Sequence, residues 1–528
     1  MKARPFLAVV LALGLTFLSL GIGGWWLLAQ RGPLALQHQP LAVPPLARFV
    51  PRQAPLALYW LSDGERPVAY ARAVASPGRR RAAAAAVEAV RDGAFAAAGL
   101  DYHDELAPWL GRELALAFTD PPAPEAPAGW LLALRSRDAA GARRFLQRFW
   151  QTRSLAGVDL QVSSFRGMGL ISGRGALRGQ EPQPLATALI NDDLVLIASG
   201  RTVLERALDA SQIEELHQAS LPGLARVVGQ AGEGVALVVA RPAALRRQLG
   251  LPLPAAQGPE LLVAALRPSG RGVRLDARLD GGPPPPALAP LQADALLDPL
   301  AASPTSLALV ENAAEQLQHP LLGPWLQAIL AAAGADQPLP QAVAAADGGP
   351  LLLASGEGGW LLGTAAADPD PQALQPALTA AGLTAAPLER AGQDLQVWTH
   401  LSVAGGRGAR PDGLRVELAA ARRPAGAVAW WSPSLALLER ADGARPAAAL
   451  LRRRDQLRAL AWPQAPLQWA LGPSAARARM AAWRPWRLLS GLAATPLADP
   501  VDGLAVAVGA DGDGWQLRAA LSLEGDDG

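Results

Sequence analysis

The first thirty residues constrain this chain most, because they have the length and character of a membrane span. No charged side chain occurs from Pro5 to Gln30, while Lys2 and Arg4 precede this stretch and Arg31 follows it. A helix of these residues would be about 39 Å long, enough to cross a hydrocarbon layer of about 30 Å. The sequence therefore predicts one transmembrane helix at residues 5–30.

The flanking residues predict that this helix stays attached and that the rest of the chain is exported. The apolar stretch is longer than that of a secretory signal, and no convincing cleavage site follows Trp25 and Trp26. Lys2 and Arg4 favour a cytoplasmic amino terminus. We expect residues 1–31 to anchor the protein in a membrane, with the bulk of the chain exported.

The composition indicates folded domains and excludes several kinds of chemistry. Half of the residues are hydrophobic and 18% are charged, as in globular proteins. A net charge of +2 gives no reason to expect nucleic-acid binding. The chain has no cysteine, which excludes disulfides, thiolate metal sites and a cysteine nucleophile.

Two proline-rich segments divide the exported part. Residues 32–45 read as a tether and residues 283–290 as a stiff linker. We expect a first domain at 46–282 and a second at 291–526, because roughly 480 residues exceed what one hydrophobic core supports.

Four sequence matches in the same order suggest that the second domain duplicates the first. Their offsets lie between 230 and 242 residues, which is too long for a solenoid repeat. The matched segments are 128–134 with 358–364, 159–162 with 394–397, 204–207 with 438–441, and 262–279 with 504–521.

The local patterns predict an α+β fold with mainly antiparallel sheet and packed helices. Residues 273–279 alternate between apolar and charged side chains, which is typical of a strand with one wet face. Residues 186–190 and 194–198 read as a hairpin. Asp138 can cap a helix that runs to Gln151, with Phe145 and Phe149 on its apolar face.

A search for catalytic and metal-binding motifs gives no assignment. The chain has no Gly-x-Ser-x-Gly nucleophile motif, and its only lysine is Lys2, which rules out a phosphate-binding loop of the usual kind. His103 lies among acidic residues that could bind a metal, although turn and cap chemistry explains them at least as well. We expect no catalytic residue, no cofactor and no metal.

A few side chains are candidates for binding. Tyr102 and Trp109 could contact a partner, and Trp430 and Trp431 could form a hydrophobic contact surface; core packing is the alternative for each. The runs Arg79–Arg81 and Arg452–Arg454 are either solvated helix faces or contacts to anionic lipid headgroups.

Several segments resemble a known family. They are Gly99–Ala117, Trp130–Leu134 with Ala142–Gln151, the end of the anchor at Gly23–Trp26, and Ala47–Pro55. Together they are similar to a cyanobacterial family catalogued as domain of unknown function 3352. This resemblance implies a membrane-anchored exported protein of a photosynthetic bacterium, held in a plasma or thylakoid membrane with the bulk of the chain periplasmic or lumenal. It brings no activity and no functional residues.

Three functions fit these observations. The first is a non-enzymatic scaffold or assembly factor that binds another membrane or exported protein. The second is a carrier or chaperone for a lipid, pigment or other apolar ligand, which needs a large apolar groove. The third is a hydrolase whose site has no recognised motif.

Overall fold

The computed structural model describes most of the chain beyond residue 31. The described residues are 32–120, 128–154, 160–175, 183–241, 244, 261–280, 288–335, 337–390, 392–403, 414–443, 445–512 and 514–523. The predicted membrane helix at residues 5–30 lies outside these ranges, as does most of the predicted linker at 283–290. Within the ranges, no helix is long and apolar enough to cross a bilayer.

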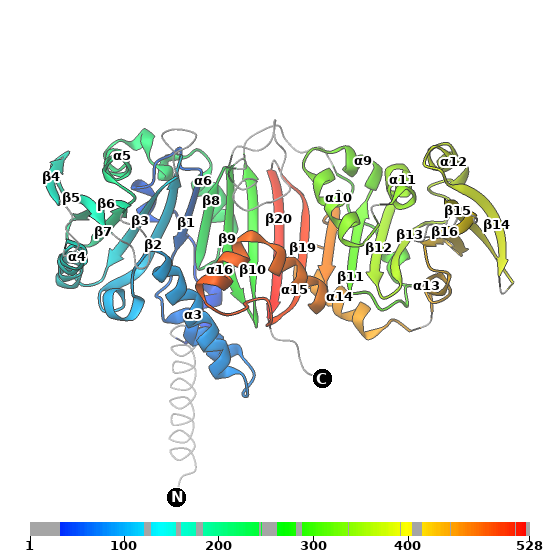
Figure 1. The fold of residues 1–528 in the computed structure, drawn as a ribbon, viewed down its shortest axis with the longest axis horizontal. Coiled ribbons are helices and arrows are strands. Elements are labelled where there is room, and N and C mark those ends of the chain that lie inside the picture. Colours follow the sequence, from blue (N-terminus) through cyan, green and yellow to red (C-terminus); the bar gives the residue numbers. More distant parts are fainter. Residues whose placement is uncertain are drawn as a thin grey trace, which may run out of the picture. The chain divides into compact units, whose positions relative to one another are not determined.

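The chain is α+β and forms two compact units, each built on antiparallel sheet (Figure 1). Unit 1 contains Met1–Leu237, Ala265–Arg271 and Leu492–Thr495. Unit 2 contains Val238–Ala264, Gly272–Gly491 and Pro496–Gly528. Strands β8 (Ala236–Ala240) and β9 (Leu261–Ser269) have residues in both units.

Unit 1 alternates short helices with antiparallel strands. Its elements are η1 (Pro33–His38), η2 (Pro45–Arg48), β1 (Leu56–Trp60), α2 (Arg66–Val74), α3 (Arg80–Ala97), η3 (Tyr102–Leu106), β2 (Leu110–Thr119), β3 (Gly129–Ser136), α4 (Ala139–Ser154), β4 (Gln161–Phe165), β5 (Met168–Gly175), β6 (Gln183–Ile190), β7 (Leu194–Ala198), α5 (Arg201–Gln212), η4 (Glu214–Leu216), η5 (Gln218–Ser220) and α6 (Leu224–Ala231).

Seven strands of unit 1 pair in the order β1–β2–β3–β7–β6–β5–β4. Leu132 of β3 and Ile197 of β7 are cross-strand partners on one face, where they join a core with Phe145 and Phe149 of α4. Helix α5 also contacts β3, β6 and β7, but its buried residues are not part of that core. We infer that α4 and α5 cover opposite faces of the sheet.

The helix and hairpin predicted in this unit are confirmed. Helix α4 begins after Asp138, whose Oδ1 accepts a hydrogen bond from the Ala140 amide at 3.0 Å. The predicted apolar positions Phe145 and Phe149 are buried. Strands β6 and β7 form the predicted hairpin.

Residues 32–45, predicted as a tether, instead pack against unit 1. Leu36 is buried against Tyr70 and Val235. The carboxylate of Glu233 accepts contacts from His38 Nδ1 at 3.3 Å and from Arg267 at 2.9 Å. The leucines of this segment explain the difference, because an aperiodic proline-rich stretch can still bury apolar side chains.

Unit 2 has the same kind of architecture. Its elements are β10 (Gly272–Asp280), α8 (Asp294–Leu297), β11 (Ser306–Glu311), α9 (Ala313–Gln318), α10 (Leu322–Ala332), α11 (Pro338–Ala346), β12 (Pro350–Gly356), β13 (Gly359–Ala365), α12 (Pro371–Ala380), β14 (Thr384–Arg390), β15 (Gln393–Val403), β16 (Leu414–Ala425), β17 (Val428–Ser432), α13 (Leu435–Glu439), α14 (Ala448–Ala459), β18 (Leu467–Leu471), α15 (Pro473–Ala482), α16 (Arg484–Leu492), β19 (Val501–Asp511) and β20 (Gly514–Leu523).

The sheet of unit 2 contains the seven-strand order β11–β12–β13–β17–β16–β15–β14. It continues from β11 through β18, β19 and β20 to β10, the strand predicted at 273–279. The core of one face joins Leu309, Leu352 and Trp430 with Leu438 of α13 and Leu450 of α14.

The first strand after each proline-rich segment is β1 in unit 1 and β11 in unit 2. When the strands are counted from these two, the seven-strand orders of the units are the same. Strands β1 to β7 pair with one another as β11 to β17 do. Gly129-Trp130 begins β3, and Gly359-Trp360 begins β13 at the corresponding place. Val162 and Val397, also matched in the sequence, lie in β4 and β15, which hold different places in the order.

Candidate binding cleft

The structure places Tyr102 and Trp109 in the core of unit 1. Tyr102 is 4% exposed and stacks on Phe95 at 5.5 Å between ring centroids, with the Arg91 guanidinium 4.0 Å from its ring. Burial, with the nearby charge of Glu65, raises the pKa of Tyr102 to about 12. Trp109 is 2% exposed, and its indole N–H donates to the carbonyl of Glu105 at 2.6 Å.

Trp430 and Trp431 are consecutive residues of β17, and neither has any exposed surface. The Trp431 ring stacks on Trp398 at 5.5 Å, and its N–H donates to Thr364 Oγ1 at 3.1 Å. Gly363 lies so close to Trp430 that an added Cβ would be 2.6 Å from the indole ring. These four aromatic residues therefore pack inside their units and present no contact surface.

The acidic cluster around His103 consists of turn and cap contacts. Asp101 accepts the amide of Asp104 at 2.9 Å. His103 lies 3.0 Å from an Arg91 nitrogen and 3.7 Å from Asp92. In the part of the chain that the structure describes, no group of three or more histidine or acidic side chains could hold a metal ion.

Unit 1 contains an open cleft of about 570 Å³ at the end of its sheet where β6 turns into β7. Its walls come from η2, the β4–β5 turn, the β6–β7 turn and the last residues of α5. The lining residues are Pro45, Arg48, Phe49, Arg135, Gly167, Met168, Gly169, Leu189, Ile190, Asn191, Asp193, Leu194, Ser211 and Gln212.

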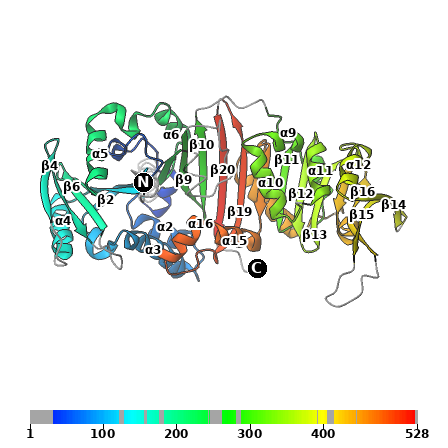
Figure 2. The same cartoon turned by 45° about the horizontal axis from the view of Figure 1, so that its top comes forward.

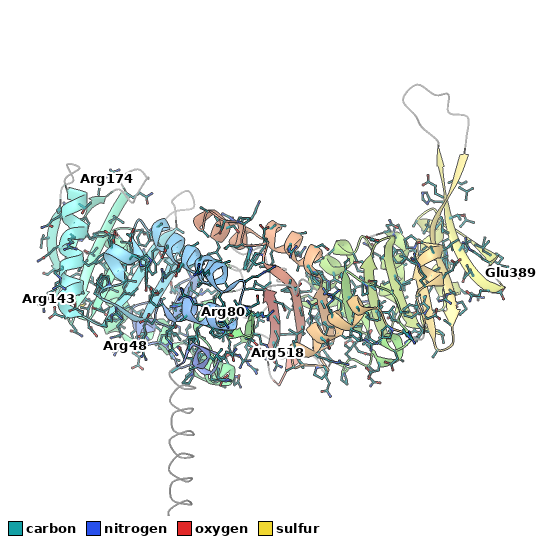
Figure 3. The ribbon with its side chains drawn as sticks, turned by 90° about the horizontal axis from the view of Figure 1, so that it is seen from below. Arg48, Arg80, Arg143, Arg174, Glu389 and Arg518 are labelled. Carbon is teal, nitrogen blue, oxygen red and sulfur yellow. The ribbon has the colours of Figure 1, made fainter. Side chains whose placement is uncertain are left out.

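The β6–β7 turn that forms one wall has left-handed backbone at two consecutive residues. Asn191 has a φ of 47° and Asp192 a φ of 61°, values that asparagine and aspartate tolerate better than other side chains. Arg143 forms an ion pair with Asp192, and this pair lowers the pKa of the carboxyl group (Figure 3 labels Arg143). The Ser136 amide donates to the carbonyl of Asp193 at 2.6 Å. These contacts hold the β6–β7 turn in place as one wall of the cleft.

The β4–β5 turn is fixed to α5 in a similar way. Arg166 and Gly167 have φ values of 51° and 81°. The Arg166 Nε donates to Asp209 of α5 at 2.7 Å. The side-chain amide of Gln212 reaches the Arg166 carbonyl at 3.4 Å. The turn therefore holds Met168 against the cleft.

The two cations of the cleft differ in how they are neutralised. Arg135 donates to Glu113 at 3.1 Å and to Asp193 at 2.8 Å, so its charge is compensated. Arg48, at the end of η2, is exposed and has no ion-pair partner among the residues with described positions (Figure 3). One guanidinium at the rim thus remains available to a bound anion.

The apolar part of the lining comes from Phe49, Met168, Leu189, Ile190 and Leu194. The lining residues include no histidine and no second carboxylate beside Asp193. The hydroxyl of Ser211 donates to the Leu208 carbonyl at 2.7 Å. The arrangement suits recognition of a ligand with apolar and acidic groups, and it contains no pair of side chains for acid–base or nucleophilic chemistry.

The sequence contains signals for parts of this cleft but none that marks it as a site. Residues 191–193 join the two strands of the predicted hairpin, and Arg48 with Phe49 lie in one of the segments of the family resemblance. The polar residues at 191–193 are a local signal for the turn that forms one wall of the cleft. Their approach to residues about 140 positions earlier is a tertiary contact that no local pattern contains.

Comparisons with known proteins identify a family and include distant matches to solved structures. A family model described as "Protein of unknown function (DUF3352)" matches residues 9–520. No curated protein matches the chain. Crystal form I of TP0453 is 12% identical, with a TM-score of 0.25 over 45% of this chain and 79% of that one; form III is also 12% identical, with a TM-score of 0.24 over 46% and 82%. Similarity this weak assigns neither a fold nor a function.

Proposed function

Since the chain belongs to the DUF3352 family of proteins of unknown function, we propose a role from its cleft and its predicted anchor. The protein is a membrane-anchored, exported scaffold or assembly factor that binds a segment of another membrane or exported protein. The observation that carries this proposal is the cleft of unit 1, with its apolar wall and the uncompensated Arg48 at its rim.

The chemistry of the lining favours a peptide segment with an acidic and an apolar side chain. A carboxylate can form a two-point contact with the Arg48 guanidinium. An apolar side chain can be buried against Phe49 and Met168. Asn191 and Gln212 offer amide groups that can hydrogen-bond to a peptide backbone.

The apolar stretch at residues 5–30 supports attachment to a plasma or thylakoid membrane, with a cytoplasmic amino terminus and a periplasmic or lumenal body. We further infer that domains 46–282 and 291–526 arose by duplication. The shared seven-strand order supports this, as do the matches at Trp130 with Trp360 and Leu204 with Leu438. A duplicated domain would give a scaffold two related binding surfaces, one in each domain.

The alternative functions receive less support from this cleft. A carrier for a lipid or pigment needs a largely apolar cavity, whereas arginine, aspartate, asparagine and glutamine contribute to this lining. A hydrolase needs converging carboxylates or a serine–histidine pair, and Ser211 is already engaged with Leu208.

Photo-cross-linking from inside the cleft tests the proposal. A benzoylphenylalanine residue at Phe49 of the full-length chain, in its native membrane, is expected to give a discrete protein adduct on irradiation. Substitution of Arg48 by glutamate in the same chain should abolish that adduct, because the rim would then repel an acidic segment.

The matched control is the same probe at Val162, which is 79% exposed on β4 and lies outside the cleft lining. It should give no adduct of the same mass. Equal adducts at Phe49 and Val162, or an adduct at Phe49 that survives Arg48→Glu, would refute binding in the cleft.

A further inference from the structure

Helices α2 and α3 of unit 1 pack against each other and are joined by residues 75–79 (Figures 1 and 2). The stretch from Arg66 to Val87 contains five arginines and no acidic residue. We call the end of this helix pair, with Arg72, Arg80 and Arg81, the cationic tip. No acidic residue within that stretch offsets its charge.

The arginines of the cationic tip project into solvent. Arg72, Arg80 and Arg81 are exposed, and none has an ion-pair partner among the described side chains (Figure 3 labels Arg80). Arg91, in the following turns of α3, is instead neutralised by Glu65 at 2.7 Å and Asp92 at 2.8 Å. The charge is therefore compensated in one part of the helix and left free at its beginning.

The position of these charges is unfavourable for the helix itself. Arg80 and Arg81 lie in the first turn of α3, which has no acidic residue. The amide groups of a first turn carry a partial positive charge, so that cations there are repelled and anions are attracted. An anionic partner would neutralise the arginine side chains and interact favourably with the amide groups at the start of the helix.

The chain path places the tip near the end of the predicted membrane segment. Segment η1 begins at Pro33, directly after Gly32, and packs on α2. Leu36 lies against Tyr70 and Val74, and the Gln37 side chain donates to the Tyr70 hydroxyl at 2.5 Å. Tyr70 is four residues from the end of α2, about 6 Å along the helix.

The distance from the membrane exit to the tip is therefore short. Gly32 precedes Leu36 by four residues, roughly 8 Å along a 3-10 helix. The contact of Leu36 with Tyr70 joins this segment to about the last 6 Å of α2, and each of the two segments is shorter than the screening length of about 10 Å at moderate salt. Extended arginine side chains on the tip reach further still.

We propose that the cationic tip binds anionic lipid headgroups at the surface of the membrane in which residues 5–30 are inserted. This inference rests on the proposed anchoring of the chain. The tip would add an electrostatic contact to the single helix and so restrict the orientation of unit 1 above the bilayer. The apolar side chains around the tip are mostly alanine, which favours surface contact over insertion.

The absence of cysteine in the chain allows a direct test with a single label. Ala82, exposed beside the arginines, is replaced by cysteine and labelled with an environment-sensitive fluorophore in the full-length protein reconstituted in nanodiscs. Exchange of phosphatidylcholine for a mixture rich in phosphatidylglycerol should shift the emission to the blue and protect the label from an aqueous quencher. High salt should reverse both effects.

Two controls define the contact. Replacement of Arg72, Arg80 and Arg81 by glutamine should remove the lipid-dependent shift. Replacement of three other exposed arginines of unit 1, Arg112, Arg148 and Arg206, removes the same charge and should preserve it.

Each remaining outcome has a defined meaning. A chain that enters the discs but shows equal quenching in both lipids overturns the inference and leaves the anchor intact. A chain that does not enter the discs overturns the anchor and the inference together. A shift produced by inorganic phosphate with neutral discs would assign the tip to a soluble anion and overturn the membrane contact.

Discussion

At the residue scale, Asp347 illustrates a buried carboxyl group without a charged partner. It lies between α11 and β12 with no exposed surface, and its Oδ2 has no hydrogen-bond partner among the described atoms. Its Oδ1 is 3.4 Å from the amide of Gly349. Burial raises the pKa of Asp347 to about 7, and the negative charges of Asp368 and Glu311 act in the same direction.

This pKa predicts a stability that falls as the pH rises. The folded state binds the proton more tightly than the unfolded state, so the free energy of unfolding decreases between about pH 4 and pH 7 and is then constant. Asp347→Asn should flatten this profile and raise the free energy of unfolding at pH 8 by on the order of 3 kcal/mol. Urea unfolding at pH 5 and pH 8 measures both.

The matched control is Asp455→Asn, because Asp455 is exposed on α14. It should leave the pH profile unchanged. A variant at Asp347 with the same pH dependence as the natural chain would show that this carboxyl group titrates normally.

The burial of the β17 tryptophans predicts a large cost on truncation. Trp431→Ala would remove the stacking on Trp398 and the hydrogen bond to Thr364. The free energy of unfolding should fall by about 3–5 kcal/mol, as for other buried aromatic side chains. Denaturant unfolding checks this value; a loss below 1 kcal/mol, the range of surface substitutions, would mean that the side chain is accessible.

At the scale of elements, the start of α3 predicts a gain in stability from charge reversal. Arg80→Glu with Arg81→Glu would place negative charge at the positive end of the helix. Each substitution should stabilise the helix by about 0.3–1 kcal/mol at low salt. Thermal unfolding should show a higher midpoint that returns toward the natural value in high salt. A lower midpoint would indicate that these arginines make stabilising contacts.

Elements with a local signal could be predicted from the sequence. The cap at Asp138, the apolar spacing to Phe149 and the alternation around Val273 depend only on neighbouring residues, and α4 and β10 are where these patterns place them. Residues 32–45 could not be predicted in the same way. Their packing depends on contacts with Tyr70, Val235 and Glu233, which are distant in sequence.

At the scale of the whole molecule, the candidate site was harder to predict than the fold class. The sequence allows either partner contact or core packing for the aromatic candidates, and Trp109 and Trp430 lie in the cores of their units. The cleft instead uses Arg48 and the turn at Asn191, which only the folded chain brings together.

The predicted anchor fixes the sidedness of the chain. A cysteine at Ala3 should be labelled by an impermeant maleimide only from the cytoplasmic side, and a cysteine at Val162 only from the other side. Membrane vesicles of opposite orientation separate the two cases, and the cysteine-free chain gives no background. Labelling of both positions from the same side would contradict a single membrane crossing.

The most direct test of the scaffold is purification of the tagged full-length chain from its native membrane in mild detergent, with proteins, lipids and pigments all quantified. The natural chain and the Arg48→Glu variant are compared. We predict a protein that copurifies in fixed proportion with the natural chain and is lost from the variant. A stoichiometric lipid or pigment without such a protein, or an identical protein set for both chains, would contradict the account.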